Sequence, residues 1–140
     1  MNKIRYSLAA SAMILVACGQ SPEANLNAMC NSVMTDPQVR SDIVRAGLDV
    51  ETYCDCATSV LLALPENEKT TAIQSFKLIE SQMAVHDGDA EAAFEAIRNA
   101  SRADDATPEA IAAYRNLDAL GDQLDDILDG LEAAGGSCPA

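Results

Sequence analysis

Four cysteines between residues 30 and 138 constrain the fold of this chain more than any other sequence feature. Cys54 and Cys56 are separated by one residue, whereas Cys30 and Cys138 lie near the two ends of this region. A helix is expected over residues 50–63, and residues two apart on a helix point about 200° away from one another. Cys54 and Cys56 should therefore face two different neighbours rather than each other.

The first eighteen residues carry a separate signal. Lys3 and Arg5 form a short basic segment, and an apolar run follows over residues 7–16. Such a run is too short to span a bilayer, which takes about 20 residues, but it is typical of a signal sequence. The run ends in Leu-Val-Ala-Cys, with the cysteine at Cys18. This sequence resembles the lipobox of bacterial lipoproteins.

The resemblance implies that the chain is cut before Cys18 and that the Cys18 thiol carries a diacylglycerol. Several acyl chains, palmitate among them, would anchor the protein stably, at about 0.8 kcal/mol for each buried methylene. In that family Asp after the cysteine retains a lipoprotein in the inner membrane, so Gly19 implies the outer membrane. We therefore expect a signal peptide over 1–17, a lipidated tether over 18–21 and one periplasm-facing domain over 22–140.

An exported domain folds in an oxidising compartment, so its four remaining thiols are expected to form two disulfides. We favour Cys30–Cys54 together with Cys56–Cys138, and the swapped pairing is the alternative. Redox catalysis and a four-thiolate zinc site compete with this interpretation. Both usually place two residues between paired thiols, and that spacing is missing here.

Net charge limits the partners of the mature chain. After removal of the leader, seven basic residues stand against 22 acidic ones, which gives a net charge of −15. This balance argues against binding to nucleic acid or directly to an anionic membrane surface. It fits a soluble envelope protein, or one that meets a basic partner.

Helix start signals recur along the mature chain, and its apolar residues are mostly Leu, Ile, Val and Ala. Alanine is the best helix former, and Ser, Thr and Asp are typical helix caps. The expected starts are at Ser21-Pro22, Asp36-Pro37, Asp49, Glu66, Asp89 and Thr107-Pro108. We predict one compact all-α domain, a bundle of about five to six helices stapled by two disulfides, with a long C-terminal helix.

The C-terminal helix carries an apolar seam whose members alternate by three and four positions. They are Ala110, Ala113, Leu117, Leu120, Leu124, Ile127, Leu131 and Ala134. Such spacing is typical of a coiled coil, but the seam begins and ends in alanine and lacks alternating flanking charges. We favour a long helix that packs across a bundle, and self-association through residues 110–134 is the alternative.

A second face of the same helix is acidic. Asp118, Asp122, Asp125 and Asp129 recur every three or four positions, and we call them the acidic stripe. A solvated face is the simplest interpretation. The functional alternative is a docking surface for a basic partner or for divalent cations. Calcium needs six to eight converging oxygens, so one straight helix would bind it weakly.

No catalytic constellation is visible in the sequence. The chain has a single histidine, His86, and neither a paired acid and base nor a phosphate-binding loop is found. We therefore expect a non-catalytic envelope protein without cofactor or metal, acting as an interaction or accessory subunit of an envelope assembly. The main alternative is a binding protein for a divalent cation or small ligand, through the acidic stripe or an apolar cavity between helices. A thiol-redox protein is a further alternative.

Overall fold

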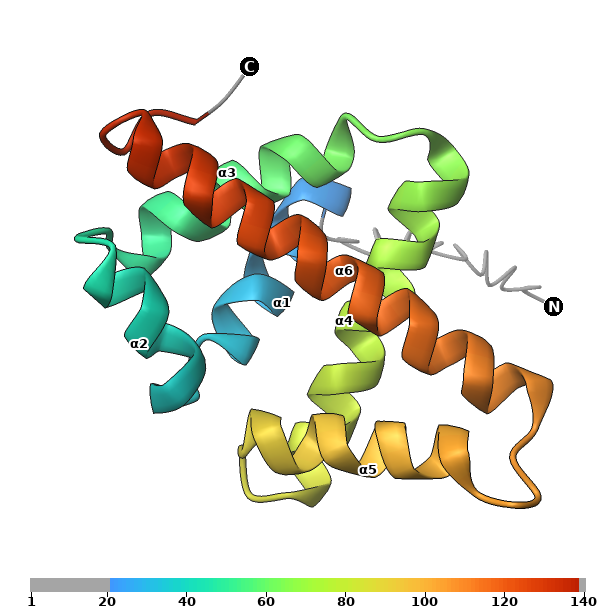
Figure 1. Ribbon diagram of the computed structural model, residues 1–140. Helices are drawn as coiled ribbons and strands as arrows, with labels where there is room; N and C mark the ends of the chain where they lie inside the picture. The colour runs from blue at the N-terminus through green and yellow to red at the C-terminus, as the bar shows by residue number, and fades with distance from the viewer. Residues whose placement is uncertain (1–20, 139–140) are drawn as a thin grey trace, which may run out of the picture.

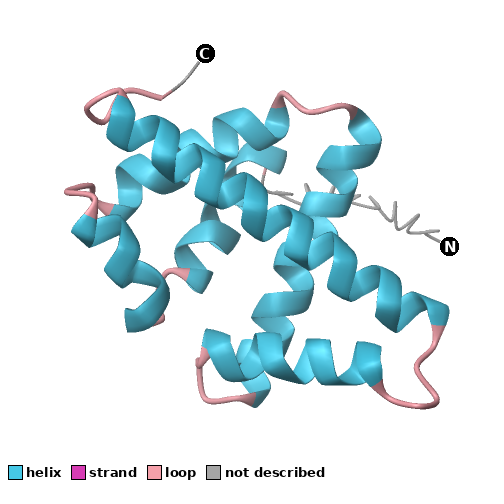
Figure 2. Ribbon diagram, in the orientation of Figure 1, coloured by secondary structure: helices cyan, strands magenta, loops and turns pink. Residues whose placement is uncertain are grey.

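The computed structural model describes residues 21–138, and this part of the chain forms six α-helices and no β-strand (Figure 1, Figure 2). The helices are α1 (Pro22–Val33), α2 (Pro37–Arg45), α3 (Val50–Leu62), α4 (Glu66–Val85), α5 (Ala90–Arg102) and α6 (Pro108–Ala133). The all-α fold expected from the sequence is confirmed. The leader and the predicted lipidation site, Cys18, lie outside the described residues.

Side-chain caps set where most of the helices begin. In α1, α2, α3, α5 and α6, the residue before the first turn accepts a hydrogen bond from a backbone N–H of that turn. These residues are Ser21, Asp36, Asp49, Asp89 and Thr107, all expected from the sequence. α4 begins directly after Pro65 and has no side-chain cap.

α6 packs against three of the other helices. It crosses α3 and α4 in the view of Figure 1 and packs against α5, which precedes it in the chain. α1 packs against α3 and α4. α2 is the least embedded helix, because Ile43 is its one buried residue. The position of α2 therefore depends on more than core packing.

One hydrophobic cluster draws side chains from all six helices. Its largest fully buried members are Phe76, Leu26, Ile43, Leu61 and Leu131. Burying a side chain of this size stabilises a fold by about 1.5–3 kcal/mol, so this cluster supplies most of the driving force for folding.

The apolar seam of α6 packs inside the domain. Leu117, Leu120, Ile127 and Leu131 are buried, and α6 contacts α3, α4 and α5. The interpretation of α6 as a long helix packing across a bundle is thus confirmed. Ala134 is exposed and caps the helix end rather than extending the seam. Self-association through α6 stays a prediction.

None of the helices between residues 21 and 138 combines the length and the apolar character needed to cross a bilayer.

Candidate functional site

Two disulfides attach α3 to both ends of the domain. Cys30–Cys54 joins α1 to α3, and Cys56–Cys138 joins α3 to the segment that follows α6. These are the two bridges of the pairing favoured from the sequence. Because Cys54 and Cys56 sit on one helix, two positions apart, they reach neighbours on different sides of it.

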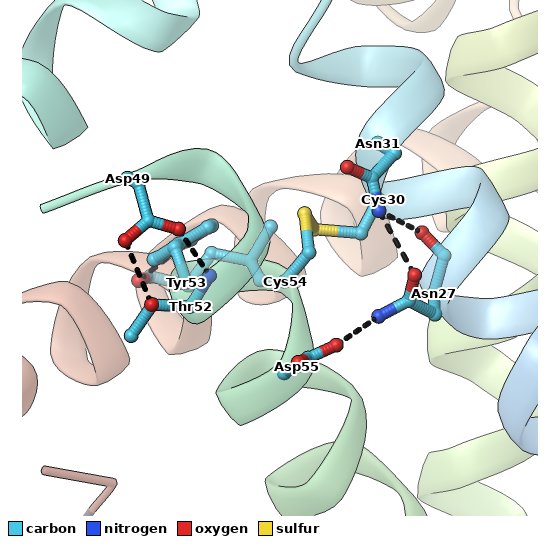
Figure 3. Close-up of a disulfide and its surroundings, with 9 residues drawn as sticks. Asn27, Cys30, Asn31, Asp49, Thr52, Tyr53, Cys54 and Asp55 are labelled. Carbon is cyan, nitrogen blue, oxygen red and sulfur yellow. Dashed lines mark hydrogen bonds between the residues drawn. A yellow bond between two sulfur atoms is a disulfide. The ribbon is translucent and has the colours of Figure 1, made fainter.

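The bridge between α1 and α3 is closed off from solvent. Cys30 and Cys54 are 1% and 0% exposed. Beside them, Asn27 Nδ2 donates a 2.7 Å hydrogen bond to Asp55 Oδ1, and Asn31 Nδ2 donates to Asn27 Oδ1 at 2.9 Å (Figure 3). Thiol–disulfide exchange requires access to a sulfur atom, so this bridge is poorly placed for redox chemistry. Its geometry supports a structural role.

Tyr53 joins α3 to α6 beneath the acidic stripe. Its side chain is 3% exposed, and its hydroxyl donates a 3.1 Å hydrogen bond to the carbonyl oxygen of Leu124. Burial, and then the nearby charge of Asp125, raise the pKa of Tyr53 above its usual range. The phenol therefore stays protonated and remains a hydrogen-bond donor at physiological pH.

The aspartates of the acidic stripe are all exposed, and α2 adds one more acid to them. Partial desolvation raises the pKa of the Asp125 carboxyl, and four neighbouring carboxylates raise it further. In decreasing order of effect these are Asp129, Asp122, Asp42 and Asp126. Asp42 belongs to α2, so the fold brings acids from two helices together. The sequence pattern along α6 alone could not show this.

The cation hypothesis finds no preformed site in the part of the chain that the structure describes. Across residues 21–138, no three His, Cys, Asp or Glu side chains are grouped so that they could hold a metal ion. The stripe extends along a helix axis instead of surrounding a point, whereas calcium takes six to eight oxygen ligands.

Asp125→Asn is expected to raise the free energy of unfolding at neutral pH by about 0.5 kcal/mol, because it removes repulsion from like charges three and four positions away. A carboxyl whose pKa is raised in the folded state binds protons more tightly when folded. Its cost to stability therefore appears as pH rises past the unfolded-state value, and it is absent below that value. Urea unfolding at neutral pH and at about pH 3 measures both effects. Asp104→Asn, exposed and off the stripe, is the control, and an equal gain there would contradict the assignment to local repulsion.

An apolar groove opens where α2, α4, α5 and α6 meet, with a volume of about 410 Å³. Its lining is mostly aliphatic and aromatic. The lining residues are Gln38, Val39, Asp42, Phe76, Ile79, Ala90, Glu91, Phe94, Leu117, Leu120, Gly121 and Leu124. The volume falls within the range of about 300–1,000 Å³ typical of ligand pockets. The groove is the most apolar candidate site, and we refer to it as the α2–α5 groove.

Asp36 links α2 and α5, two of the helices that line this groove. One carboxylate oxygen accepts hydrogen bonds from the backbone N–H groups of Gln38 and Val39, at 2.7 and 3.2 Å, in the first turn of α2. The other accepts from the N–H of Ala90, at 2.8 Å, in the first turn of α5. Asp36 is 6% exposed, and the Ala90 bond is the largest of the effects that lower the pKa of its carboxyl. One charged side chain thus caps two helices at once.

Two acidic side chains line the groove, Asp42 on the α2 wall and Glu91 on the α5 wall. On α6, Asp125 follows the lining residue Leu124, and its carboxyl is close enough to Asp42 for the two charges to interact. The arrangement combines an apolar floor with a negatively charged rim. It can bind a surface that is apolar at its centre and basic at its edges.

The sequence pattern shows the acids on α6 and the apolar residues of each helix separately. It predicts an apolar cavity between helices only in general terms and does not locate one. The sequence signal nearest the groove is the helix start at Asp36, whose carboxylate has acceptor capacity beyond its own helix, but its burial and its bond to Ala90 depend on tertiary packing.

Comparisons of the chain with protein-family models, with curated proteins and with solved structures give no match.

Proposed function

We propose that the protein is a non-catalytic, lipid-anchored subunit of a bacterial envelope assembly and that it docks a partner protein through the α2–α5 groove. The observation that carries this proposal is the groove itself, an apolar hollow of about 410 Å³ whose lining includes Asp42 of α2 and Glu91 of α5. Apolar hollows with a polar rim are typical of interaction sites.

The anchor is proposed from the leader and its lipobox-like end at Cys18. Ser21 already caps α1, so at most two residues separate Cys18 from the folded domain. Such a short link would hold the domain close to the membrane surface. Gly19 after the cysteine supports the outer membrane as the location, with the domain in the periplasm.

Cys18→Ser is expected to abolish lipidation and to move the protein out of the membrane fraction or leave its leader uncleaved. Cells fed radiolabelled palmitate should label the unaltered chain and not the variant, because no thiol remains to accept the diacylglycerol. Cys138→Ser is the matched control, since it removes a thiol outside the leader. Palmitate labelling that persists in Cys18→Ser would contradict the anchor.

Docking is tested in intact envelopes with a photo-crosslinking amino acid at Glu91, on the groove rim, or at Asp104, between α5 and α6. The proposal expects Glu91 to crosslink to one envelope protein in high yield and Asp104 not to do so. The same crosslinks from both positions would contradict docking through the groove.

A small apolar ligand is the second candidate, because the volume of the groove is that of a ligand pocket. Native mass spectrometry of the protein purified from its host separates the two candidates. A bound small molecule would favour the ligand, and its absence together with a crosslinked partner would favour the subunit.

A further inference from the structure

We infer that the α2–α5 groove binds an amphipathic helix of the partner protein, with the apolar face of that helix in the groove and its basic flanks against the acidic rim. This inference rests on the proposed docking function and specifies the chemistry of the partner.

The groove has the shape and lining that such a helix needs. Val39 of α2, Phe94 of α5 and Leu124 of α6 are the partly exposed apolar residues of its lining, and they lie over a floor of buried side chains from α4 and α6. An amphipathic helix presents side chains at positions i, i+3 or i+4, and i+7 on one face. These are the anchors by which helix-in-groove partners are held.

The rim selects for positive charge. Glu91 and Asp125 take part in none of the salt bridges seen within residues 21–138, so their carboxylates are available to a partner. Asp42 pairs with Arg45 at 2.8 Å, but both side chains are mostly exposed and such pairs contribute little. No basic residue follows Arg115 in the sequence, so the part of α6 after this residue offers no competing cation.

Charge also argues against the other occupants. A second copy of this chain would bring one strongly acidic surface against another, and an anionic lipid surface would be repelled. A small uncharged ligand would gain nothing from the acids at the groove. A helix with an apolar face and basic flanks is complementary to both the apolar lining and the acidic residues of the groove.

Gly121 leaves space for the partner on the α6 wall. A Cβ atom added at this position would have no neighbouring atom within 4 Å, and the residue is exposed inside a helix. Gly121→Leu should therefore fill the groove without disturbing the backbone, and helix propensity favours leucine over glycine. Gly121→Ala is the matched control, because it gives a similar helix benefit with little occupied volume.

The probe is a fluorescent synthetic helix of about 18 residues, with leucine at i, i+3, i+4 and i+7 and lysine elsewhere. Two matched peptides accompany it: a scrambled sequence of the same composition and a twin with glutamate in place of lysine. Fluorescence anisotropy with the intact protein in neutral phosphatidylcholine vesicles reports binding, and vesicles without protein give the blank. We expect the lysine helix to bind at least about tenfold more tightly than either matched peptide, since both apolar periodicity and charge are required.

The variants locate the binding on the protein. Gly121→Leu is expected to weaken binding at least about tenfold and Gly121→Ala less than about twofold, because only the leucine occupies the apolar space. Glu91→Gln with Asp125→Asn should weaken binding about fivefold and reduce its salt dependence, whereas Asp104→Asn with Asp105→Asn, an equal charge change away from the groove, should not. Circular dichroism melting of each variant verifies that it is folded.

Equal binding of the scrambled peptide, or full binding by a folded Gly121→Leu variant, would overturn the inference. If the lysine helix does not bind but Glu91 still crosslinks to a partner, the basic helix is refuted while the docking role stands. If the lysine helix does not bind and Glu91 does not crosslink, both the basic helix and the docking role are refuted. An oligomer that Gly121→Leu dissociates would identify a second copy as the occupant and refute the inference as well.

Discussion

Replacing Cys56 and Cys138 together by serine is expected to lower the free energy of unfolding by about 4.5 kcal/mol. The two cysteines lie 82 positions apart, so their bridge closes most of the domain into one loop. Without this bridge the unfolded chain gains conformational freedom, which lowers its free energy relative to that of the folded state. Against a total stability of about 5–15 kcal/mol for a typical domain, the loss is large.

The native structure of this double variant is expected to change little. Cys138 is exposed in the tail, and α6 stays anchored in the core through Leu131, which is 0% exposed. Urea unfolding followed by circular dichroism, without reductant, measures the loss. A decrease below about 1 kcal/mol would contradict the loop-closure argument.

Cys30→Ala with Cys54→Ala is the comparison. Its bridge spans 24 positions, so the loop term is smaller, about 3.5 kcal/mol. Both of its sulfurs are buried, so their removal also leaves a void and disturbs native packing.

The bridges can be assigned chemically because a protease that cuts before aspartate separates Cys54 from Asp55-Cys56. Non-reducing peptide maps should then show Cys30 linked to Cys54 and Cys56 linked to Cys138.

The helices could be predicted because their starts are local. Asp49 and Thr107 cap α3 and α6 through hydrogen bonds to residues three positions ahead, a distance that the sequence displays directly. Exposure was harder to predict. Ile43 and Val44 are neighbouring apolar residues of α2, yet Ile43 is buried and Val44 is 61% exposed. A short helix with one buried residue leaves its second apolar position to tertiary packing, which periodicity does not encode.

The candidate site was harder to predict than the helices for the same physical reason. Its lining comes from four helices between Gln38 and Leu124, and no local pattern links them. The acidic stripe was visible as a repeat on α6, but its relation to Asp42 depends on where α2 packs. The contact that determines this position, from Asp36 to Ala90, spans 54 residues.

This long-range contact gives the second large prediction. Asp36→Ala is expected to lower the free energy of unfolding by about 3 kcal/mol, with about 1 from the lost cap of α2 and the rest from the buried N–H of Ala90 left without an acceptor. Asp36→Asn should cost less, about 2 kcal/mol, since its amide oxygen can still cap α2 but its NH₂ group cannot accept from Ala90. Hydrogen exchange should show the first turns of α2 and α5 opening more often, while α3 keeps its protection.

The pH dependence of the free energy of unfolding distinguishes the loss of a charged hydrogen-bond acceptor at Asp36 from a change in packing. The pKa of Asp36 is lowered in the folded state, so its stabilisation is complete above the unfolded-state value of 3.8 and is lost as pH falls through the folded-state value. The difference in free energy of unfolding between the unaltered protein and Asp36→Asn should therefore be constant near neutral pH and should disappear in acid. Asp49→Asn is the matched control, because Asp49 caps α3 through Thr52 alone and is exposed. If Asp36→Asn lowers the free energy of unfolding only as much as Asp49→Asn does, the link between α2 and α5 does not hold the groove together. A decrease for Asp36→Asn that persists unchanged in acid would lead to the same conclusion.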